Sequence, residues 1–509
     1  MPSLSNLLNC IYFFNQLLYI LYLVMKFKPI NCISLLSFLL TTTVLVSAEN
    51  ANKPNILFIL TDDLGINDLA CYGRKEHNTP NIDRLANEGL KFTRAYCALP
   101  ICSPSRAGIM TGKNPAVLHL TTFLPGRTDC PSQKLLHPKI EQNLPLEEKT
   151  IAEHLKELGY ATAYIGKWHL GGKGFTPKEQ GFDFYHPGNA ITKPSATEGG
   201  KGEYDLTRTA IKFMETNKNN PFFIYLAHNT PHIPYSAKDE LVEKNKNAFE
   251  PVYAALMETV DDTVGMLMRK LDELGLSKNT IVIFTSDNGG LHVPELNHKI
   301  ITHNNPYRAG KGYLYEGGLR IPLIVRWQGR IPAGKVIDSP VINTDWLPTF
   351  LKLLDAPIPA GLDGESILDT LISGKETGRQ RRFYFHFPHY TNQGGRPGGA
   401  VIEGEWKLIE NYEDGSLELY NLQTDISERH NLAKSEPALT SRLYNLLDQW
   451  RLKNKVQTNS VNPNFNPELH RKLYIDIDPS LFNPLITKDF DQILEWRKLM
   501  DTVVKMKQQ

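Results

Sequence analysis

The sequence predicts an α/β fold, with a large, mostly parallel central sheet flanked by helices and a smaller antiparallel sheet with one helix behind it. Three observations support this prediction. Short apolar runs alternate with amphipathic helical patterns between residues 54 and 327, which is typical of a parallel sheet covered on both faces. Beyond about residue 380, short strand-like runs are separated by Gly- and Asp-rich turns. A single helical pattern at residues 438–454 follows them.

Each predicted strand of the large sheet is an apolar run too short for a helix and bounded by turn-forming residues. The expected strands are residues 54–60, 160–166, 221–227, 279–286 and 320–327. Helical patterns lie between them, at residues 79–89, 149–159, 206–217 and 248–275. The first two helices carry matching end signals, because Thr79 and Thr150 precede them and a glycine follows each.

The length of 509 residues and the changes in pattern divide the chain into four parts. We expect a presequence at residues 1–48, a catalytic domain at 49–380, a small antiparallel subdomain at 381–454 and an extension at 455–509. The extension is rich in Asn and Pro and then helical, and we expect it to wrap over the surface. The formal net charge of +1 excludes a chain-wide basic field of the kind that binds nucleic acid.

Residues 1–48 contain no acidic residue and only two basic ones, Lys26 and Lys28. From Met25 onward, a basic start, an apolar run and small residues up to Ala48 predict a secretory signal that is cleaved after Ala48. The residues before Met25 are also apolar, so a membrane anchor is the alternative, but the signal pattern favours Met25 as the true start. We therefore expect an exported protein, periplasmic or extracellular.

Four cysteines lie beyond the presequence: Cys71, Cys97, Cys102 and Cys130. No two of them form a C-x-x-C pair, which argues against a zinc knuckle. An exported protein can pair some of them, and the sequence does not determine which. Cys102 differs from a structural cysteine because its neighbours are polar and include a proline. This composition predicts a loop.

Polar side chains follow four of the predicted strands, at the point where each strand ends. In an open α/β sheet, ligands bind in the crevice at the carboxyl ends of the strands, so we expect these side chains to meet at one place. They are Asp62 and Asp63, Lys167 and His169, His228 and His232, and Asp287 and Asn288.

The converging carboxylates of Asp62, Asp63 and Asp287 would repel one another unless a cation neutralises them. Together with the oxygen of Asn288 they form an all-oxygen set, which suits calcium or magnesium better than zinc. A helix cap or a loop feature is the alternative role for Asp62 and Asp63 taken alone.

Basic groups near the same edge of the sheet predict an anionic substrate. Lys167 and Lys311 are bracketed by glycines, which let a backbone approach a ligand closely. Arg106 lies four residues after Cys102. The alternative for each of the three is an exposed charge, and for His232 it is a structural role. A histidine at a strand end beside a metal cluster is nevertheless a candidate acid or base.

The stretch CSPSRAGIMTG, residues 102–112, resembles the signature of the type I sulfatases, in the alkaline phosphatase superfamily. Five further stretches agree with that family: NILFILTDDLG, GYATAYIGKWHLG, PFFIYLAHNTPH, IVIFTSDNGG and YRAGKGYLYEGGLRIPLIV. The resemblance runs from about residue 53 to 450 and implies an alkaline-phosphatase-like sheet. It also implies that a formylglycine-generating enzyme recognises this stretch and converts Cys102 to formylglycine (3-oxoalanine).

The resemblance further implies a metal site and a mechanism. One calcium ion per chain, with magnesium less usual, would be bound by Asp62, Asp63, Cys102, Asp287 and Asn288. The catalytic residues would be Cys102, Arg106, Lys167, His169, His232 and Lys311. One hydroxyl of the formylglycine diol would lose its proton to Asp287, attack sulfur and form a covalent sulfate intermediate. His232 would protonate the leaving alcohol, and His169 would help the second hydroxyl expel sulfate.

The implied activity is the hydrolysis of sulfate esters of carbohydrates in polysaccharide degradation. Residues 118–138 and 385–402 resemble segments of bacterial carbohydrate sulfatases, with ulvan, carrageenan and glycosaminoglycan oligosaccharides as candidate substrates. His386 and His389 either contact the sugar or have a core or turn role. The alternative functions are a phosphoester or phosphonate hydrolase of the same superfamily and a non-catalytic sugar-binding relative. The cysteine motif favours sulfate, and none of the expected groups is missing.

Overall fold

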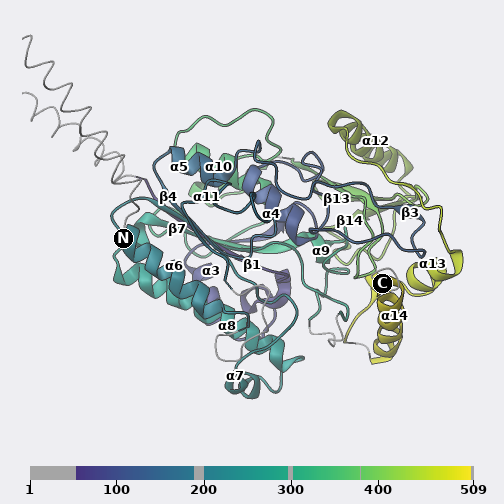
Figure 1. Cartoon of the computed structure of the whole chain (residues 1–509), viewed down its shortest axis with the longest axis horizontal. Helices are drawn as coiled ribbons and strands as arrows, with labels where there is room; N and C mark the ends of the chain where they lie inside the picture. Colours follow the sequence, from purple (N-terminus) through teal and green to yellow (C-terminus); the bar gives the residue numbers. More distant parts are fainter. Residues whose placement is uncertain (1–52, 189–199, 296–301, 379, 486, 506–509) are drawn as a thin grey trace, which may run out of the picture. The chain divides into compact units, whose positions relative to one another are not determined.

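A mixed sheet of nine strands forms the centre of the chain from Pro54 onward (Figure 1). The structure is a computed structural model that describes residues 53–188, 200–295, 302–378, 380–485 and 487–505. Eight strands lie in the order β10 (Val341–Ile342), β2 (Leu90–Tyr96), β8 (Arg320–Arg326), β7 (Thr280–Ser286), β1 (Asn55–Thr61), β6 (Phe222–Ala227), β4 (Ala161–Gly166) and β5 (Phe184–His186). The ninth, β9 (Lys335–Ile337), pairs with β2.

The predicted mostly parallel sheet is confirmed, with one antiparallel strand inside it. Strands β7, β1, β6, β4 and β5 run parallel to their neighbours within this group, whereas β8 runs antiparallel to both β7 and β2. The sequence does not predict β2, β5, β9 or β10. Polar residues interrupt the apolar ones in β2, and β5, β9 and β10 have only two or three residues each, so none shows the continuous apolar run of a central strand.

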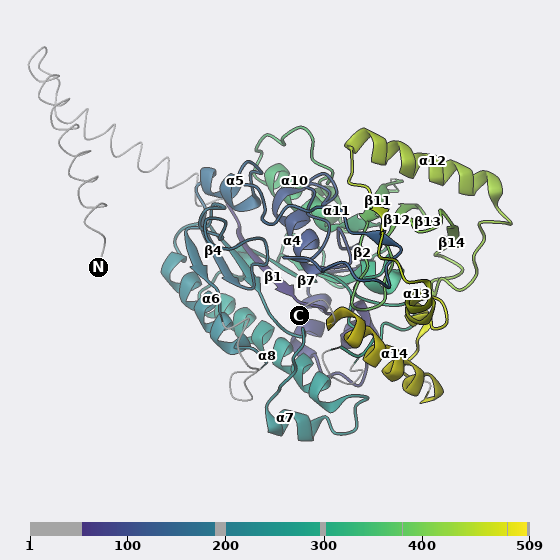
Figure 2. The same ribbon diagram turned by 45° about the vertical axis from the view of Figure 1, so that its right-hand side comes forward.

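Helices cover both faces of the sheet, as Figure 2 shows from a second direction. Side chains of β1 alternate between the faces, so Leu57 and Ile59 enter one core and Phe58 and Leu60 enter the other. The first core includes α3 (Pro80–Asn87), α6 (Glu203–Asn217) and α8 (Pro251–Glu273). The second includes α4 (Cys102–Thr111), α5 (Ile151–Glu157) and α10 (Trp346–Leu353). Complete burial of each such apolar side chain contributes about 1.5–3 kcal/mol, which favours a position for β1 inside the sheet with both faces covered.

The smaller antiparallel sheet is also confirmed. It contains β11 (Arg382–Phe387), β12 (Gly398–Glu403), β13 (Trp406–Asn411) and β14 (Leu417–Asn421), in that order. Helix α12 (Pro437–Asn454) covers one face, where Leu443 and Leu447 pack against Val401 and Leu408. The other face joins the core of the large sheet, through residues such as Phe385.

The extension beyond residue 454 packs against loops of the large sheet. It contains β15 (Ser460–Val461), which pairs with β3 (Leu135–Leu136), and the helices α13 (Pro467–Tyr474) and α14 (Thr487–Lys505). Trp496 and Met500 of α14 share an apolar cluster with Ile233 and Leu291, which follow β6 and β7. The remaining described helices are α7 (Asp239–Lys244), α9 (Glu316–Leu319) and α11 (Leu368–Ser373).

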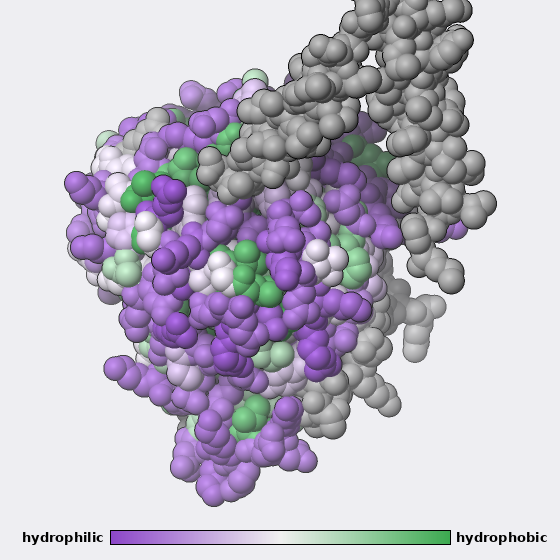
Figure 3. All heavy atoms as spheres, turned by 90° about the vertical axis from the view of Figure 1, so that its left-hand side faces the viewer, coloured by the Kyte–Doolittle hydropathy of each residue, from purple (hydrophilic) through white to green (hydrophobic). Residues whose placement is uncertain are grey.

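Polar residues dominate the face that Figure 3 presents, and apolar residues appear there only in small, separate groups. Among the described residues, no helix is long and apolar enough to cross a membrane. The predicted presequence at residues 1–48 lies outside the described residues. Strand β11 begins at Arg382 and α12 ends at Asn454, and the domain limits proposed from the sequence stay predictions.

Candidate active site

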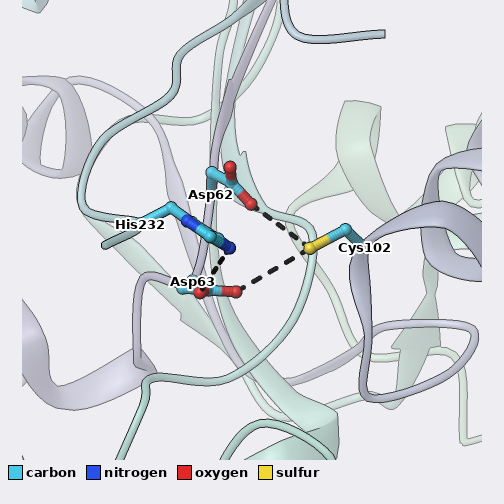
Figure 4. A group of neighbouring side chains, drawn as sticks. All are labelled: Asp62, Asp63, Cys102 and His232. Atoms are coloured by element: carbon cyan, nitrogen blue, oxygen red, sulfur yellow. Dashed lines mark hydrogen bonds and ion pairs between the residues drawn. The ribbon is translucent and has the colours of Figure 1, made fainter. Parts of the chain in front are cut away.

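Most of the polar residues at the strand ends converge, as the sequence predicts. Strands β4, β6, β1 and β7 are parallel neighbours, so their carboxyl ends meet at one edge of the sheet. Asp62 and Asp63 follow β1, Asp287 and Asn288 follow β7, Lys167 follows β4, and His232 lies beyond the end of β6. Figure 4 shows the innermost part of this group, where Asp62, Asp63 and His232 point toward Cys102.

Cys102 lies at the start of a helix, which corrects the prediction of a loop. Ile101 is extended and α4 begins at Cys102, and all ten residues of the helix are buried. Proline is tolerated in the first turn of a helix, where its missing N–H would have no partner within the helix, so Pro104 does not prevent helix formation. The Sγ atom of Cys102 lies 3.4 Å from Asp62 Oδ1, 3.9 Å from Asp63 Oδ1 and 3.5 Å from Lys167 Nζ.

Three acidic and three basic side chains pair around the thiol, and nearly all are buried. Lys167 Nζ lies 2.6 Å from Asp62 Oδ2, Lys311 Nζ lies 2.8 Å from Asp63 Oδ2, and Arg106 Nη2 lies 2.8 Å from Asp287 Oδ2. Arg106 also donates from Nη1 to the Lys167 carbonyl oxygen at 2.6 Å. The predicted carboxylates and cations therefore form one cluster, which we call the reactive cluster.

The carboxyl groups of this cluster differ in their pKa values. Burial acts to raise the pKa of Asp62 and Asp63, but the neighbouring cations, Lys167 for Asp62 and Lys311 for Asp63, outweigh it and lower both. Burial and the charge of Asp62 raise the pKa of Asp287 to about 7. Burial also raises the pKa of the Cys102 thiol well above its ordinary value, although Lys167 acts against it. As encoded, Cys102 is therefore a neutral thiol.

The arrangement fits a divalent cation bound mainly by oxygen. Asp62, Asp63, Cys102 and His232 offer ligand atoms that all lie within 4.8 Å of one another. Asn288 donates from Nδ2 to Asp63 Oδ1 at 2.8 Å, and its buried Oδ1 has no hydrogen-bond partner among the described residues. An unpaired buried oxygen costs free energy, and a bound cation would satisfy it. Carboxylate and amide oxygens are ligands that hard cations prefer.

The two histidines use their ring nitrogens in opposite ways. The imidazole of His232 holds the Ile233 carbonyl oxygen with Nδ1 at 2.6 Å, and its Nε2 lies 3.7 Å from Asp63 Oδ2. His169 holds the Leu124 carbonyl oxygen with Nε2 at 2.9 Å, and its Nδ1 is buried without a partner among the described residues. Burial, with Lys311 beside His232 and Lys167 beside His169, lowers the pKa of each ring to about 3. Both rings are therefore neutral here.

Three predicted residues have their described contacts outside the reactive cluster. His228 is buried and bonds through Nδ1 to Glu203 Oε2 at 2.5 Å. His386 is buried and uses both ring nitrogens, with the Tyr412 hydroxyl and a backbone carbonyl. His389 is buried and bonds through Nε2 to a threonine hydroxyl at 2.8 Å. The substrate role of His386 and His389 stays a prediction.

Sequence reasoning misses Lys201, a buried lysine beside the His232 loop. Its Nζ donates to the Ile233 carbonyl oxygen at 2.6 Å. The signal was present in the sequence, because Lys201 lies in GGKGEYD and is bracketed by glycines like Lys167 and Lys311.

Comparison with known proteins agrees with this geometry. Residues 54–356 match the Sulfatase family, and residues 309–454 match the family N-sulphoglucosamine sulphohydrolase, C-terminal. The N-acetylgalactosamine-6-O-sulfatase of Bacteroides thetaiotaomicron is 30% identical over 503 residues, covering 79% of this chain and 94% of that protein. Human arylsulfatase A is 32% identical, covering 79% of this chain and 88% of that protein. The solved structure of Ps i-CgsB in complex with k-i-k-neocarrahexaose superposes with a TM-score of 0.68 at 31% identity, covering 79% of this chain and 93% of that chain.

The match to the Sulfatase family spans more than half of the chain. Every residue of the reactive cluster lies within that match. Relatives that share about 30% of their residues with the chain are themselves sulfatases and are matched over most of their length. The chain belongs to the sulfatase family and is a sulfuric ester hydrolase.

Proposed function

We propose that this sulfatase hydrolyses sulfate esters of carbohydrates and that its active form carries formylglycine at position 102. The arrangement around Cys102 carries the proposal, because its thiol lies between two aspartates and Lys167 within a cluster of balanced charge. Two relatives support a sugar substrate, one named for a sulfated amino sugar and one solved with an oligosaccharide. Human steryl-sulfatase is 31% identical over 66% of the chain, so the substrate class needs a direct test.

The cysteine as encoded is a poor nucleophile. A thiol acts through its thiolate, and burial holds the Cys102 thiol in its neutral form. The hydrate of formylglycine would supply an oxygen nucleophile at the same position. Conversion by a formylglycine-generating enzyme during maturation is therefore part of the proposal.

Lys167 and Lys311 are the side chains that would receive the sulfate oxygens. Each ammonium group already pairs with an aspartate of the reactive cluster and has further N–H donors. Charge-assisted hydrogen bonds of this kind are stronger than neutral ones, and they stabilise charge that develops on peripheral oxygens. Arg106 has a different role, because it holds Asp287 and the Lys167 carbonyl and so fixes the geometry of the site.

A calcium ion bound by Asp62, Asp63, Asp287, Asn288 and residue 102 would polarise the sulfate and acidify the attacking hydroxyl. Magnesium is the second choice, because it demands a more rigid octahedral geometry.

The hydrogen bonds of the two histidines support a division of labour between them. A carbonyl oxygen only accepts, so Nε2 of His169 carries the hydrogen and its Nδ1 has a free lone pair. That lone pair suits His169 to accept a proton. His232 instead holds its carbonyl with Nδ1, which leaves Nε2 on the side of Asp63. The negative charge of a bound sulfate ester would favour the imidazolium form of His232, in which Nε2 carries a second hydrogen. We assign His232 the transfer of that proton to the leaving alcohol oxygen, after which the ring returns to the neutral form with its hydrogen on Nδ1.

The test is desulfation of a panel of defined compounds by the matured enzyme. The panel contains oligosaccharides from ulvan, carrageenan and glycosaminoglycans, an aryl sulfate, a steryl sulfate and a phosphate monoester. We expect release of sulfate from at least one oligosaccharide class with a higher kcat/KM than from the aryl and steryl esters. Cleavage of the steryl sulfate alone, or of the phosphate ester alone, contradicts the proposal.

We also propose that the protein is exported, to the periplasm or the outside of the cell, and loses its presequence on the way. The proposal rests on the signal pattern between Lys26 and Ala48. N-terminal sequencing of the mature protein should give a start near Glu49. A mature chain that keeps the residues before Met25 would support a membrane anchor instead.

A further inference from the structure

The carbonyl oxygen of Ile233 is held from two sides. Nδ1 of His232 lies 2.6 Å from it, and Nζ of Lys201 lies 2.6 Å from it as well. A carbonyl oxygen has two lone pairs and accepts two hydrogen bonds. Lys201 is 5% exposed, so its ammonium group is largely removed from water. A buried lysine that donates to a backbone carbonyl next to a proposed proton donor requires an explanation.

This shared carbonyl determines the orientation of the His232 ring. Because the oxygen cannot donate, the hydrogen of the neutral ring must sit on Nδ1, and Nε2 is the atom left on the side of Asp63. The side chain of His232 is 26% exposed, so surrounding apolar packing does not fully fix it. Its orientation therefore depends on where the Ile233 carbonyl lies.

The start of α6 holds the whole loop that carries His232. Glu203 accepts hydrogen bonds from the Thr230 hydroxyl at 2.6 Å and from His228 Nδ1 at 2.5 Å. A Cβ atom on Gly200 would lie 2.5 Å from Thr230 Oγ1, so the backbone of Gly200 approaches the Thr230 side chain closely. Glu203 thus fixes the beginning of the loop, and Lys201 fixes the end at which His232 lies.

We propose that Lys201 is a positioning residue for proton transfer by His232. It fixes the Ile233 carbonyl, and that carbonyl accepts the Nδ1–H of His232, so that Nε2 faces the leaving oxygen. When the ring is protonated, Nε2 carries the second hydrogen, and loss of that hydrogen to the leaving oxygen gives the neutral tautomer with hydrogen on Nδ1. Lys201 itself does not contact the reacting atoms. The inference rests on the proposed function, since it assigns a partner to the residue that protonates the leaving alcohol.

The kinetic test compares Lys201→Met with the wild type on two sulfate esters. One is a sulfated sugar, whose alcohol is a poor leaving group, and the other is nitrophenyl sulfate, which hardly needs a proton. General acid catalysis typically accelerates a reaction about 10²–10⁴-fold, and a general acid in the wrong position loses part of this acceleration. We expect kcat to fall about 10–100-fold on the sugar and less than about threefold on nitrophenyl sulfate, with KM little changed. Lys201→Arg should restore most of the rate on the sugar.

Three further variants define what would overturn the inference. His232→Ala should show the same dependence on the leaving group, and adding Lys201→Met to it should cause little further loss, because both act on one step. Lys212, exposed on α6, which begins two residues after Lys201, is the matched control, and Lys212→Met should change neither rate. Equal losses on both esters for Lys201→Met, or additive losses in the double variant, contradict a positioning role. A wild type that cleaves neither ester contradicts the proposed function instead.

A second measurement does not depend on activity. Long-range 1H–15N NMR of histidine-labelled enzyme reports which ring nitrogen carries the hydrogen, and His232→Ala identifies the signal of His232. The wild type should show hydrogen on Nδ1, and Lys201→Met should show a mixture of tautomers. An unchanged His232 signal in Lys201→Met would overturn the inference even if the variant were poorly active.

Discussion

Two of the buried groups of charged side chains that the structure describes differ in the polar atoms left unpaired beside them. The reactive cluster joins three carboxylates to Lys167, Lys311 and Arg106 at the strand ends. A second group joins the large sheet to the small one, and we call it the junction cluster. It consists of Glu316, Arg320, Lys407 and Glu428, all buried.

In the junction cluster, every charged group faces a group of opposite charge or a hydrogen-bond donor. Glu316 lies 2.6 Å from Arg320 and 3.1 Å from Lys407, while Glu428 lies 2.8 Å from Lys407 and accepts the Glu316 N–H at 2.7 Å. Every carboxylate oxygen therefore has a cation or a donor beside it, and Glu428 Oε1 is paired with Lys407 by charge without a hydrogen bond. Next to the reactive cluster, the Oδ1 of Asn288 and the Nδ1 of His169 have neither a hydrogen-bond partner nor an ion-pair partner among the described residues.

The reactive cluster is also more exposed to solvent than the junction cluster. The side chains of Lys167 and His232 are 15% and 26% exposed, whereas Lys407 and Glu316 are completely buried. Balanced buried charge alone therefore does not identify an active site. Unpaired polar atoms beside a partly exposed edge distinguish the reactive cluster from the junction cluster, because such atoms have capacity for a ligand.

Replacing Cys102 by alanine should remove activity by at least about 10³-fold, because no other group supplies a nucleophile at that position. The fold should persist, since the thiol makes only contacts of 3.4 to 3.9 Å in the site. Steady-state kinetics of the matured enzyme measures this. Cys97→Ala, at a buried cysteine outside the reactive cluster, is the matched control and should keep its activity.

Mass spectrometry tests the chemical form of the same residue. In active enzyme, the tryptic peptide that contains residue 102 should be lighter than encoded, in proportion to specific activity. Full activity with wholly unmodified Cys102 contradicts the formylglycine proposal.

Removal of divalent ions should change the properties of the reactive cluster and leave the junction cluster unaffected. We expect chelation to lower activity at least about 100-fold and calcium to restore it better than magnesium. Calcium at 100 times its Kd should also stabilise the protein by about 2.7 kcal/mol, measured as a rise in Tm. Asn288→Ala should lose most of this rise. If calcium leaves the Tm of the wild type unchanged while Asn288→Ala keeps full activity, the metal assignment is wrong.

The sequence could predict most of the reactive cluster but not its local structure. Its acidic residues and lysines follow apolar strands or lie between glycines, and both patterns are visible without a structure. The helix at Cys102 was missed because Ser103, Pro104 and Ser105 favour turns, although the first turn of a helix accepts them.

The junction cluster could not be predicted. Glu316 is separated from Lys407 by 91 residues and from Glu428 by 112, and lone charged residues in a sequence usually indicate exposed positions. The antiparallel direction of β8 could not be predicted either, because an apolar run does not specify the direction of a strand. Both features depend on how distant segments pack.

Breaking the junction cluster should cost stability. Lys407→Met removes the cation shared by Glu316 and Glu428 and leaves buried carboxylates undercompensated, which typically costs about 3–5 kcal/mol. Urea unfolding measures the loss. Lys472→Met, which breaks an exposed ion pair on α13, should leave the free energy of unfolding nearly unchanged. Equal effects of the two variants would remove the distinction between the junction cluster and a surface pair.

The smallest effect we predict is a dependence of stability on pH at the same cluster. Burial raises the pKa of Glu428 from 4.5 to about 7, although Lys407 acts against it. The folded state therefore binds a proton that the unfolded state has already released in this window. The contribution of Glu428 to the free energy of unfolding is therefore fully present below about pH 4.5 and is lost as the pH rises through about 7.

Glu428→Gln isolates that contribution, because glutamine does not titrate and keeps an oxygen that can accept the Glu316 N–H. Urea unfolding at pH 5 and pH 8 should show that the wild type loses about 1–3 kcal/mol more than the variant over this interval. Other groups titrate in both proteins, so only the difference between the two losses counts. A loss of the same size in both would mean that Glu428 is ionised throughout. All four side chains of the junction cluster would then be charged, and ion pairs alone would hold them together.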